Sequence, residues 1–153
     1  MGDFAGDVLL IETPDGGDIV LEDGRVKPCR DFSTAVYLSL FGGNKDDAGT
    51  VKNRHTWWAN TLKETPENEK MISRFQAVIA GLPLSVKNIR KAETAAALDL
   101  EWLKSEGAAD EIIAEGKTRG KNIFALKIEI KNSGTSLYEK EFSLLWENGI
   151  HGV

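Results

Sequence analysis

The chain has 153 residues, 41% of them hydrophobic and 28% charged, which is the composition of one folded domain and not of a disordered segment. No aliphatic run is longer than that of residues 8–11, far below the roughly 20 apolar residues that span a bilayer. A net charge of −5 argues against nucleic-acid binding, and one cysteine with two histidines argues against an internal disulfide and a Cys/His zinc cage. We therefore expect no metal, no cofactor, no membrane contact and no nucleic-acid partner.

The negative charge is concentrated at the start of the chain. Residues 1–24 carry seven acidic side chains and no Lys or Arg, so this segment is −7 and the remainder is +2. The seven are Asp3, Asp7, Glu12, Asp15, Asp18, Glu22 and Asp23. Two interpretations stay open, a solvated acidic hairpin or an acidic arm that guides docking to a basic partner.

The first predicted element is a β-hairpin. Residues 8–13 are rich in Val, Leu and Ile, which favours a strand, and residues 14–18 have the Pro, Asp and Gly content of a turn. Residues 19–21 form the returning strand, and Asp23-Gly24 forms a second turn. Residues 1–27 are therefore interpreted as an acidic hairpin arm.

Three helices are predicted within residues 31–107. Asp31 can cap the first, which runs to Phe41 and stops at Gly42-Gly43. The second has Pro66 in its first turn and ends at Gly81. The third and longest begins at Ser85 and ends at Gly107. Its apolar stripe has helical spacing and consists of Ile89, Ala92, Ala96, Leu100 and Leu103, widened by Ala95, Leu98 and Trp102.

The remainder, residues 110–147, has the pattern of antiparallel strands. Residues 111–115 suggest a short strand and residues 116–121 a basic turn. Apolar and polar residues then alternate over residues 123–130, and again in a last strand that ends at Trp146. The expected fold is a single α+β domain over residues 1–153, in which an N-terminal β-hairpin and three helices precede a C-terminal antiparallel β-meander packed on the long helix.

The sequence shows no convincing catalytic or ligand-binding motif. Gly116-Lys117-Thr118 resembles the end of a P-loop, but Glu111 stands where the phosphate cradle needs glycine. Residues 15–18 lack the spacing of a calcium loop, and Cys29 has no neighbouring histidine in the sequence. Among many carboxylates, Glu101 beside Trp102 is the one candidate for glycosidase chemistry, and the polar face of a helix explains it better. We expect no enzyme.

An adjacent pair of tryptophans stands out in the polar stretch between the first two helices. Trp57 and Trp58 cannot both point into one helical core, because neighbouring helical residues differ by about 100° in direction. Core packing and partner contact are both open for this pair, and tryptophan is enriched at interface hot spots.

The ordered combination of these features resembles a known family, the small baseplate wedge subunits of Mu-like contractile-tailed phages. That family has a Thr-Ala-Val-x-x-Ser-Leu-Phe segment after Asp-Gly turns, here residues 34–41. It also has a Trp-Trp pair after a polar loop and a last strand that ends in an apolar residue and Trp, here Leu145-Trp146. The resemblance covers residues 7–147. Many members of the broader group of lysozyme-like wedge proteins, found in phage tails and type VI secretion baseplates, have a Glu-Pro-Arg tripeptide ahead of a late strand, where this chain has residues 109–112.

The resemblance implies a structural role in a tail baseplate and no enzyme activity. It implies a larger wedge subunit as the main partner, contacts with the tail sheath protein and with other baseplate, tube or hub proteins, and a place in the virion after assembly in the host cytoplasm. A sheet edge that pairs with an arm of the sheath protein is the expected contact.

The residues that we expect to bind partners come from the tryptophan pair, the last hairpin and the acidic arm. They are Trp57, Trp58, Phe124, Leu126, Ile128, Phe142, Leu144, Trp146, Asp15 and Asp18. The charged outer face of the last hairpin is expected to include Lys127, Glu129, Lys140 and Glu141. Alternative functions are a cell-wall glycan hydrolase and a small adaptor that binds through its acidic arm.

Overall fold

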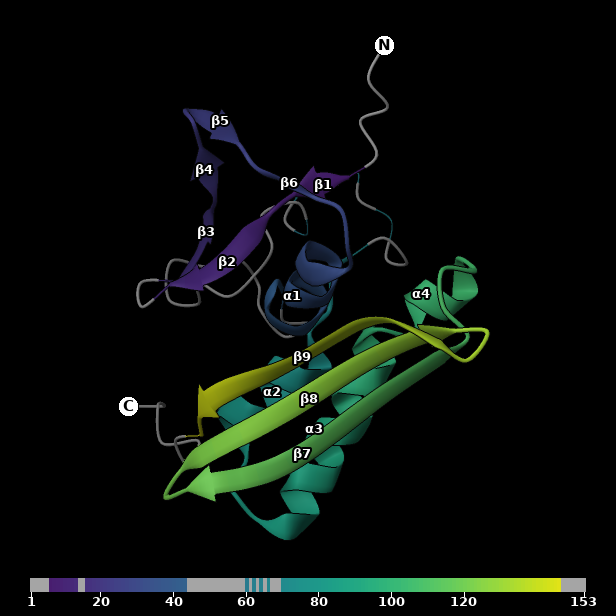
Figure 1. Cartoon of the computed structure of the whole chain (residues 1–153). Helices are drawn as coiled ribbons and strands as arrows, with labels where there is room; N and C mark the ends of the chain where they lie inside the picture. The colour runs from purple at the N-terminus through teal and green to yellow at the C-terminus, as the bar shows by residue number, and fades with distance from the viewer. Residues whose placement is uncertain are drawn as a thin grey trace.

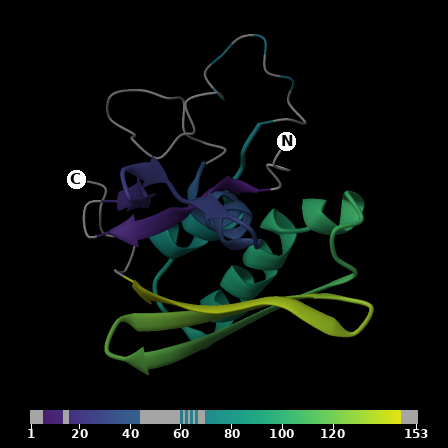
Figure 2. The ribbon, with the colours of Figure 1, turned by 45° about the horizontal axis from the view of Figure 1, so that its top comes forward.

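The computed structural model describes residues 6–13, 16–43, 60, 62, 64, 66 and 70–146. It has the expected α+β architecture, with N-terminal strand pairs, then helices, then a three-stranded antiparallel sheet on the longest helix (Figure 1). The view in Figure 2 separates the layers: the sheet lies along the bottom, the helices cover one of its faces, and the N-terminal strands lie beyond α1. No helix in the described ranges combines the length and the apolar character needed to cross a membrane.

The C-terminal sheet has the strand order β7-β8-β9, with β7 at Glu111–Gly120, β8 at Ile123–Asn132 and β9 at Thr135–Leu145. The predicted alternation is confirmed, because one face of the sheet is apolar and covered by helices. The buried side chains of this face are Phe124, Leu126, Ile128, Ile130, Tyr138, Phe142 and Trp146. Trp146 closes the core from the end of the sheet, where its indole N–H donates to the Leu82 carbonyl (2.7 Å).

The predicted basic turn at residues 116–121 is wrong. Strand β7 continues through this stretch, and the turn consists of Lys121 and Asn122, the latter at φ +60°. Position 116 of this strand is a glycine because any larger side chain would clash with its neighbours. A Cβ at this position would lie 2.7 Å from the ring of Phe124 and 3.0 Å from Ile89 of the long helix. The glycine that suggested a turn is instead a packing residue between strand and helix.

The long helix α3 spans Val86–Asp99, and its predicted N-cap is confirmed because Ser85 Oγ accepts the Asn88 N–H (3.2 Å). The five residues of its predicted stripe are all buried. The helix does not continue to Gly107: it breaks at Asp99, and the short helix α4 follows at Trp102–Ser105. Leu98, on the outer side of α3, and Trp102, after the break, are both largely exposed, so the prediction that they widen the core stripe is wrong.

Helix α2 spans Arg74–Gly81 and begins eight residues after Pro66, so the predicted start in the first turn around this proline is wrong. Its start is set by a tertiary contact. The carboxylate of Asp99, at the end of α3, accepts the backbone N–H groups of Arg74 (3.0 Å) and Phe75 (2.9 Å). A side chain from another helix therefore satisfies the orphan donors of the first turn of α2.

Helix α1 spans Ser33–Phe41, close to its predicted bounds. The Asp31 carboxylate accepts the Ser33 N–H (2.9 Å), which orders the chain at the helix start. The hydroxyl of buried Ser73 donates to the Ser39 carbonyl (2.9 Å) and accepts the Gly43 N–H (3.1 Å). These bonds join the end of α1 to the start of α2.

The N-terminal arm consists of short antiparallel pairs. Its strands are β1 (Asp7–Val8), β2 (Leu10–Thr13), β3 (Gly16–Ile19), β4 (Leu21–Glu22), β5 (Arg25–Val26) and β6 (Pro28–Cys29). The pairs are β1 with β6, β2 with β3, and β4 with β5, and backbone bonds among Leu9, Val20 and Lys27 join them. Asp23 and Gly24 form the second predicted turn with positive φ at both residues (50° and 72°).

Residues 16–18 belong to strand β3 and not to the predicted first turn. Gly17 is again a packing residue and not a turn residue. A Cβ at this position would lie 2.7 Å from the hydroxyl of Tyr37 on α1, so only glycine lets the strand lie this close to the helix. The arm is also held by Thr34, whose buried hydroxyl accepts the Leu10 N–H (3.1 Å) and donates to the Val8 carbonyl. Two residues of α1 thus anchor the arm to the rest of the fold.

Candidate functional site

The two edges of the C-terminal sheet differ in how their backbone groups are satisfied. On the β7 edge, Gly116 directs its N–H away from β8, where the Glu93 carboxylate of α3 accepts it (2.8 Å). Arg90 holds that carboxylate in place through its Nη1 atom, which lies 3.0 Å and 2.8 Å from the two oxygens. A charged side chain of the long helix therefore occupies the middle of the β7 edge and obstructs pairing with another strand.

Within the described ranges, no strand pairs with the β9 edge from Glu139 to Leu145. The Trp146 N–H points toward β8, where it donates to the Asn122 carbonyl (2.7 Å). Because backbone directions alternate along a strand, the outward N–H and C=O groups of β9 belong to Glu139, Glu141, Ser143 and Leu145. In the described part of the chain, no backbone or side-chain group bonds to them. These four residues, which we call the β9 edge, offer a row of hydrogen-bonding groups to an added strand.

Most side chains predicted to bind a partner on the last hairpin lie in the core. Phe124, Leu126, Ile128, Phe142 and Trp146 are at most 4% exposed, and Leu144 is half-buried against the same cluster. Their alternation directs them toward the helices, so a partner cannot reach them in this fold, and this part of the prediction is corrected. What the hairpin does expose is the backbone of its outer strand.

The outer face of the sheet is charged and largely self-paired. Lys127 pairs with Glu139 (3.2 Å), and Lys117 and Arg119 both pair with Glu141. These two cations hold the pKa of Glu141 below its ordinary value, Lys117 having the larger effect. Cross-strand pairs of this kind suppress unspecific pairing of an exposed sheet.

Lys140 does not belong to the outer face, contrary to the prediction. Its register partner is Ile128, and its side chain lies on the helix-covered side of the sheet, as that of Phe142 does. The ammonium group is exposed and lies 4.9 Å from the centroid of the Phe142 ring. An inward-pointing charge on an edge strand limits which strands can add to it, since a tightly packed apolar partner would bury the charge.

Three of the predicted partner-binding residues, Trp57, Trp58 and Asp15, lie outside the described residues. Asp18 is exposed on strand β3 of the arm, opposite Ile11. The acidic arm therefore presents at least this predicted residue to solvent.

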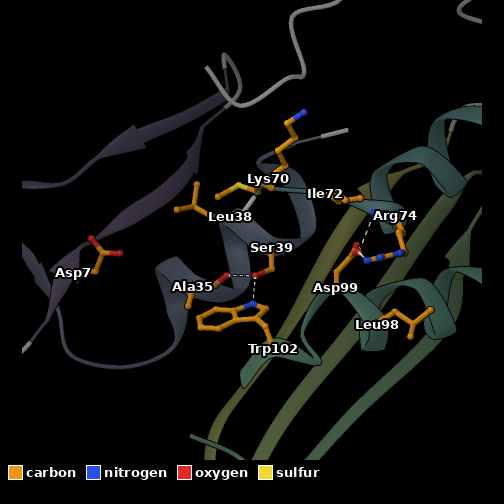
Figure 3. Close-up of a pocket in the computed structure, with 11 residues that line it drawn as sticks. Asp7, Ala35, Leu38, Ser39, Lys70, Ile72, Arg74, Leu98, Asp99 and Trp102 are labelled. Atoms are coloured by element: carbon orange, nitrogen blue, oxygen red, sulfur yellow. Dashed lines mark hydrogen bonds and ion pairs between the residues drawn. The ribbon is translucent and has the colours of Figure 1, made fainter. Parts of the chain in front are cut away.

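A cleft of about 600 Å³ opens between α1, the segment before α2, and the junction of α3 with α4 (Figure 3). Its lining includes Leu38, Met71, Ile72, Leu98 and Trp102. The half-exposed indole of Trp102 is fixed in place, because its N–H donates to Ser39 Oγ (3.0 Å), whose hydroxyl in turn donates to the Ala35 carbonyl (2.7 Å).

The polar end of this cleft is the contact between Asp99 and Arg74. The Asp99 carboxylate is inaccessible to solvent and lies 3.2 Å from Arg74 Nη1, in addition to accepting the two backbone N–H groups at the start of α2. Burial raises its pKa, and the hydrogen bonds and the guanidinium oppose this effect. The hydrogen bonds of the Asp99 carboxylate all join α2 to α3, so this carboxylate stabilises the packing of the two helices.

The sequence contained a signal for Asp99 that the prediction missed. Asp99 lies three residues after Ala96 and four before Leu103, which places a carboxylate on the apolar stripe itself. A charge at a core position needs hydrogen-bonding partners, and a neighbouring helix start is a suitable one. Glu93, which covers the β7 edge, gave a comparable signal, because it lies four residues after Ile89 and three before Ala96, which is the spacing of the same stripe.

The remaining candidates for chemistry have ordinary structural environments. Glu101 is exposed and pairs with Lys104 three residues later (3.0 Å). Cys29 is buried, and its thiol donates to the Asp31 carbonyl and carboxylate (both 3.2 Å). Among the residues that the structure describes, no three His, Cys, Asp or Glu side chains lie close enough to hold a metal ion.

Comparisons with known proteins give no match to this chain. No family model matches it, and neither the curated proteins nor the solved structures include one with significant similarity.

Proposed function

We propose that this protein is a structural subunit of a contractile phage tail baseplate, a small wedge subunit that binds a larger wedge subunit and helps to anchor or initiate the tail sheath. It acts by assembly and carries no catalytic site. The tail sheath protein and neighbouring baseplate, tube or hub proteins are its further partners, in the virion and during assembly in the host cytoplasm. The observation that carries the proposal is the open β9 edge, and the ordered motifs of the sequence support it.

The two edges of the sheet make this assembly directional. An added strand can bond to the outward groups of Glu139, Glu141, Ser143 and Leu145, whereas at the β7 edge it meets the Glu93 carboxylate on Gly116. Main-chain bonds of this kind provide affinity for many partner sequences, and the side chains beside the edge select among them. The charge of Lys140 on the covered side and the ion pairs of the outer face favour a partner strand with polar or acidic residues at the positions that face them.

The test removes one hydrogen-bond donor from the β9 edge without touching the core. Ser143 is exposed, its N–H points outward, and its side chain lies on the outer face, so Ser143→Pro removes no bond within the sheet. Phe142, before it, already has the extended backbone that a following proline requires. Ser143→Thr is the matched control, since it keeps the N–H and favours a strand.

Each variant is co-expressed with the larger wedge subunit encoded nearby and examined by size-exclusion chromatography with light scattering. We expect wild type and Ser143→Thr to elute in a complex of defined stoichiometry, and Ser143→Pro to elute alone while its circular dichroism and Tm stay close to those of wild type. A complex that persists with a folded Ser143→Pro would show that the β9 edge is not the contact. Failure of wild type to form any complex would overturn the wedge assignment itself.

A further inference from the structure

Lys140 places a charge on an otherwise apolar side of β9. The even-numbered residues from 138 to 144 share the helix-covered side of the strand, and Tyr138 and Phe142 are buried there. The Lys140 side chain is exposed, and its ammonium group lies 4.9 Å from the centroid of the Phe142 ring. Within the described ranges, no carboxylate forms an ion pair with this group. The covered side of the β9 edge therefore carries one positive charge without an acidic partner.

The outer face of β9 carries no such charge. Its two acids, Glu139 and Glu141, already pair with three cations of β7 and β8. An added strand therefore gains little from a charged side chain on the outer face, where neutral polar side chains suit it. The selection among partner strands depends on the side that carries Lys140.

A residue directly opposite Lys140 on an added antiparallel strand lies close to it on the same side of the sheet. The backbone groups of Lys140 point toward β8, so these two residues form a non-hydrogen-bonded pair, with Cα atoms about 4.5 Å apart. At that separation opposite charges on the facing side chains stabilise the pair, whereas like charges destabilise it. An apolar residue would cover the ammonium group without giving it a partner. An acidic residue is therefore the side chain that fits opposite Lys140.

The surface beside Lys140 on the covered side is aromatic. The ring centroid of Phe41 on α1 lies 5.7 Å from that of Phe142 and 5.5 Å from that of Tyr37, and Figure 1 shows α1 alongside β9. Phe41 and Tyr37 are half-buried, so part of each side chain remains accessible. On an added strand, the side chains two residues before and after the acid lie on this same side, because strand residues alternate between faces. Apolar side chains at these positions extend the aromatic cluster.

We propose that the β9 edge selects an extended segment with an acidic residue opposite Lys140, neutral polar residues on either side of that acid, and apolar residues at the next positions outward. The outward backbone groups provide the affinity for a strand, and Lys140 provides the selection among strands. Two copies of β9 centred on Lys140 would bring two ammonium groups together, so the fitting partner is a different chain. This inference rests on the strand addition proposed above and adds the chemistry of the partner to it.

Three synthetic peptides test the selection. The first, Thr-Val-Thr-Glu-Thr-Val-Thr with capped ends, has the proposed pattern and reads the same in both directions, so it fits parallel and antiparallel addition. The other two have glutamine or lysine in place of the central glutamate. NMR titration of isotope-labelled protein, with up to about 5 mM peptide, measures Kd values near 1 mM and shows which amides respond. The amides expected to respond are those of Glu139, Glu141 and Ser143.

We expect wild type to bind the glutamate peptide about two- to fivefold more tightly than the glutamine peptide, and the lysine peptide more weakly than either. The net charge of the protein is −5, so unspecific attraction would favour the lysine peptide, and the expected order requires a local cation. Lys140→Glu should invert the order. Lys87→Glu is the matched control, since it makes the same change in net charge at an exposed residue of α3, which packs on β7 at the other edge. It should keep the wild-type order, and circular dichroism and Tm show that both variants are folded.

The outcomes separate this inference from the proposed function. Equal binding of the three peptides at the β9 amides would show that the edge adds a strand but that Lys140 does not select it, which overturns the inference alone. A preference for the glutamate peptide that persists in Lys140→Glu would also overturn it. If no peptide affects the β9 amides, strand addition itself is excluded, and both proposals lose the contact on which they rest.

Discussion

The body of this protein buries its large apolar residues, whereas the arm leaves many of its large apolar residues exposed to solvent. In the body, residues 33–43 and 70–146, the sheet and the helices enclose a continuous core that includes Phe75, Phe124 and Trp146, none of which is more than 1% exposed. In the arm, the large apolar residues Val8, Ile11, Ile19, Leu21 and Val26 all remain exposed, and anchoring depends on a few contacts with α1. The body is therefore built to be stable by itself, whereas the arm is built as a surface whose stability depends on what it contacts.

The largest expected effect comes from a core substitution in the body. Phe124→Ala removes a ring that packs edge-to-face on Trp146 (5.0 Å between centroids) and contacts Phe75. We expect the free energy of unfolding to fall by about 3–5 kcal/mol. Leu21→Ala in the arm is the matched comparison, with an expected change within about 0.5 kcal/mol. Urea unfolding measures both, and equal effects would contradict the contrast between body and arm.

A glycine substitution tests how tightly strand and helix pack. Gly116→Ala places a Cβ against the Phe124 ring and Ile89, and we expect a loss of about 1–3 kcal/mol. Gly81→Ala is its control, since a Cβ there meets nothing within 4 Å. Thermal unfolding should show a lower Tm for the first variant and an unchanged or higher Tm for the second. An unchanged Tm for Gly116→Ala would show that strand β7 and helix α3 are not closely packed at Gly116.

The attachment of the arm can be loosened without unfolding the body. Thr34→Val keeps the shape of the side chain but removes the hydroxyl that bonds to Leu10 N–H and the Val8 carbonyl. We expect a cost of about 1 kcal/mol that is confined to the arm. Hydrogen exchange should become faster at Leu10, while amides of α3 and β8 keep their rates. Faster exchange throughout the body would show that the arm is part of its cooperative unit.

The smallest effect concerns pH. Burial and the nearby Asp31 carboxylate raise the pKa of Tyr138 to about 12, from an ordinary value of 10.0. The folded protein therefore holds this proton more tightly than the unfolded chain, so the contribution of Tyr138 is complete below pH 10 and is lost as pH rises toward 12. Tyr138→Phe should leave stability near pH 7 little changed and should flatten this alkaline decline. An identical decline in the variant would assign it to other groups.

The fold was predictable from the sequence where the pattern is local. The alternation of residues 123–130, the stripe of α3 and the Ser85 cap are all confirmed, because each follows from periodicity or from a neighbouring residue. Predictions failed where a distant contact decides the structure. The positions of Gly116 and Gly17 in strands depend on Phe124 and Tyr37, and the start of α2 depends on Asp99, twenty-five residues away from Arg74.

The candidate site was predictable only in part. The sequence pointed to the last hairpin and to a sheet edge, and partner binding there stays a prediction. The sequence could not show which edge lacks a neighbouring group in the described residues. That depends on Glu93 reaching Gly116 from another element, and the helical spacing of Glu93 does not show which backbone group its carboxylate meets. The apolar side chains of the hairpin were assigned to partners because alternation identifies an apolar face without showing what covers it. The helices of the same chain cover that face.

The most direct test of the central claim follows individual amides of the two sheet edges by hydrogen exchange. In the free protein, the amides of Glu139, Glu141, Ser143 and Leu145 should exchange quickly, because they point away from β8. In a complex with the proposed partner, a larger wedge subunit, these four should become protected while the outward amides of β7, at Ile112 and Ala114, keep their rates. Protection in that alternating pattern is the result the account predicts. A defined complex in which these four amides still exchange quickly would contradict strand addition at the β9 edge.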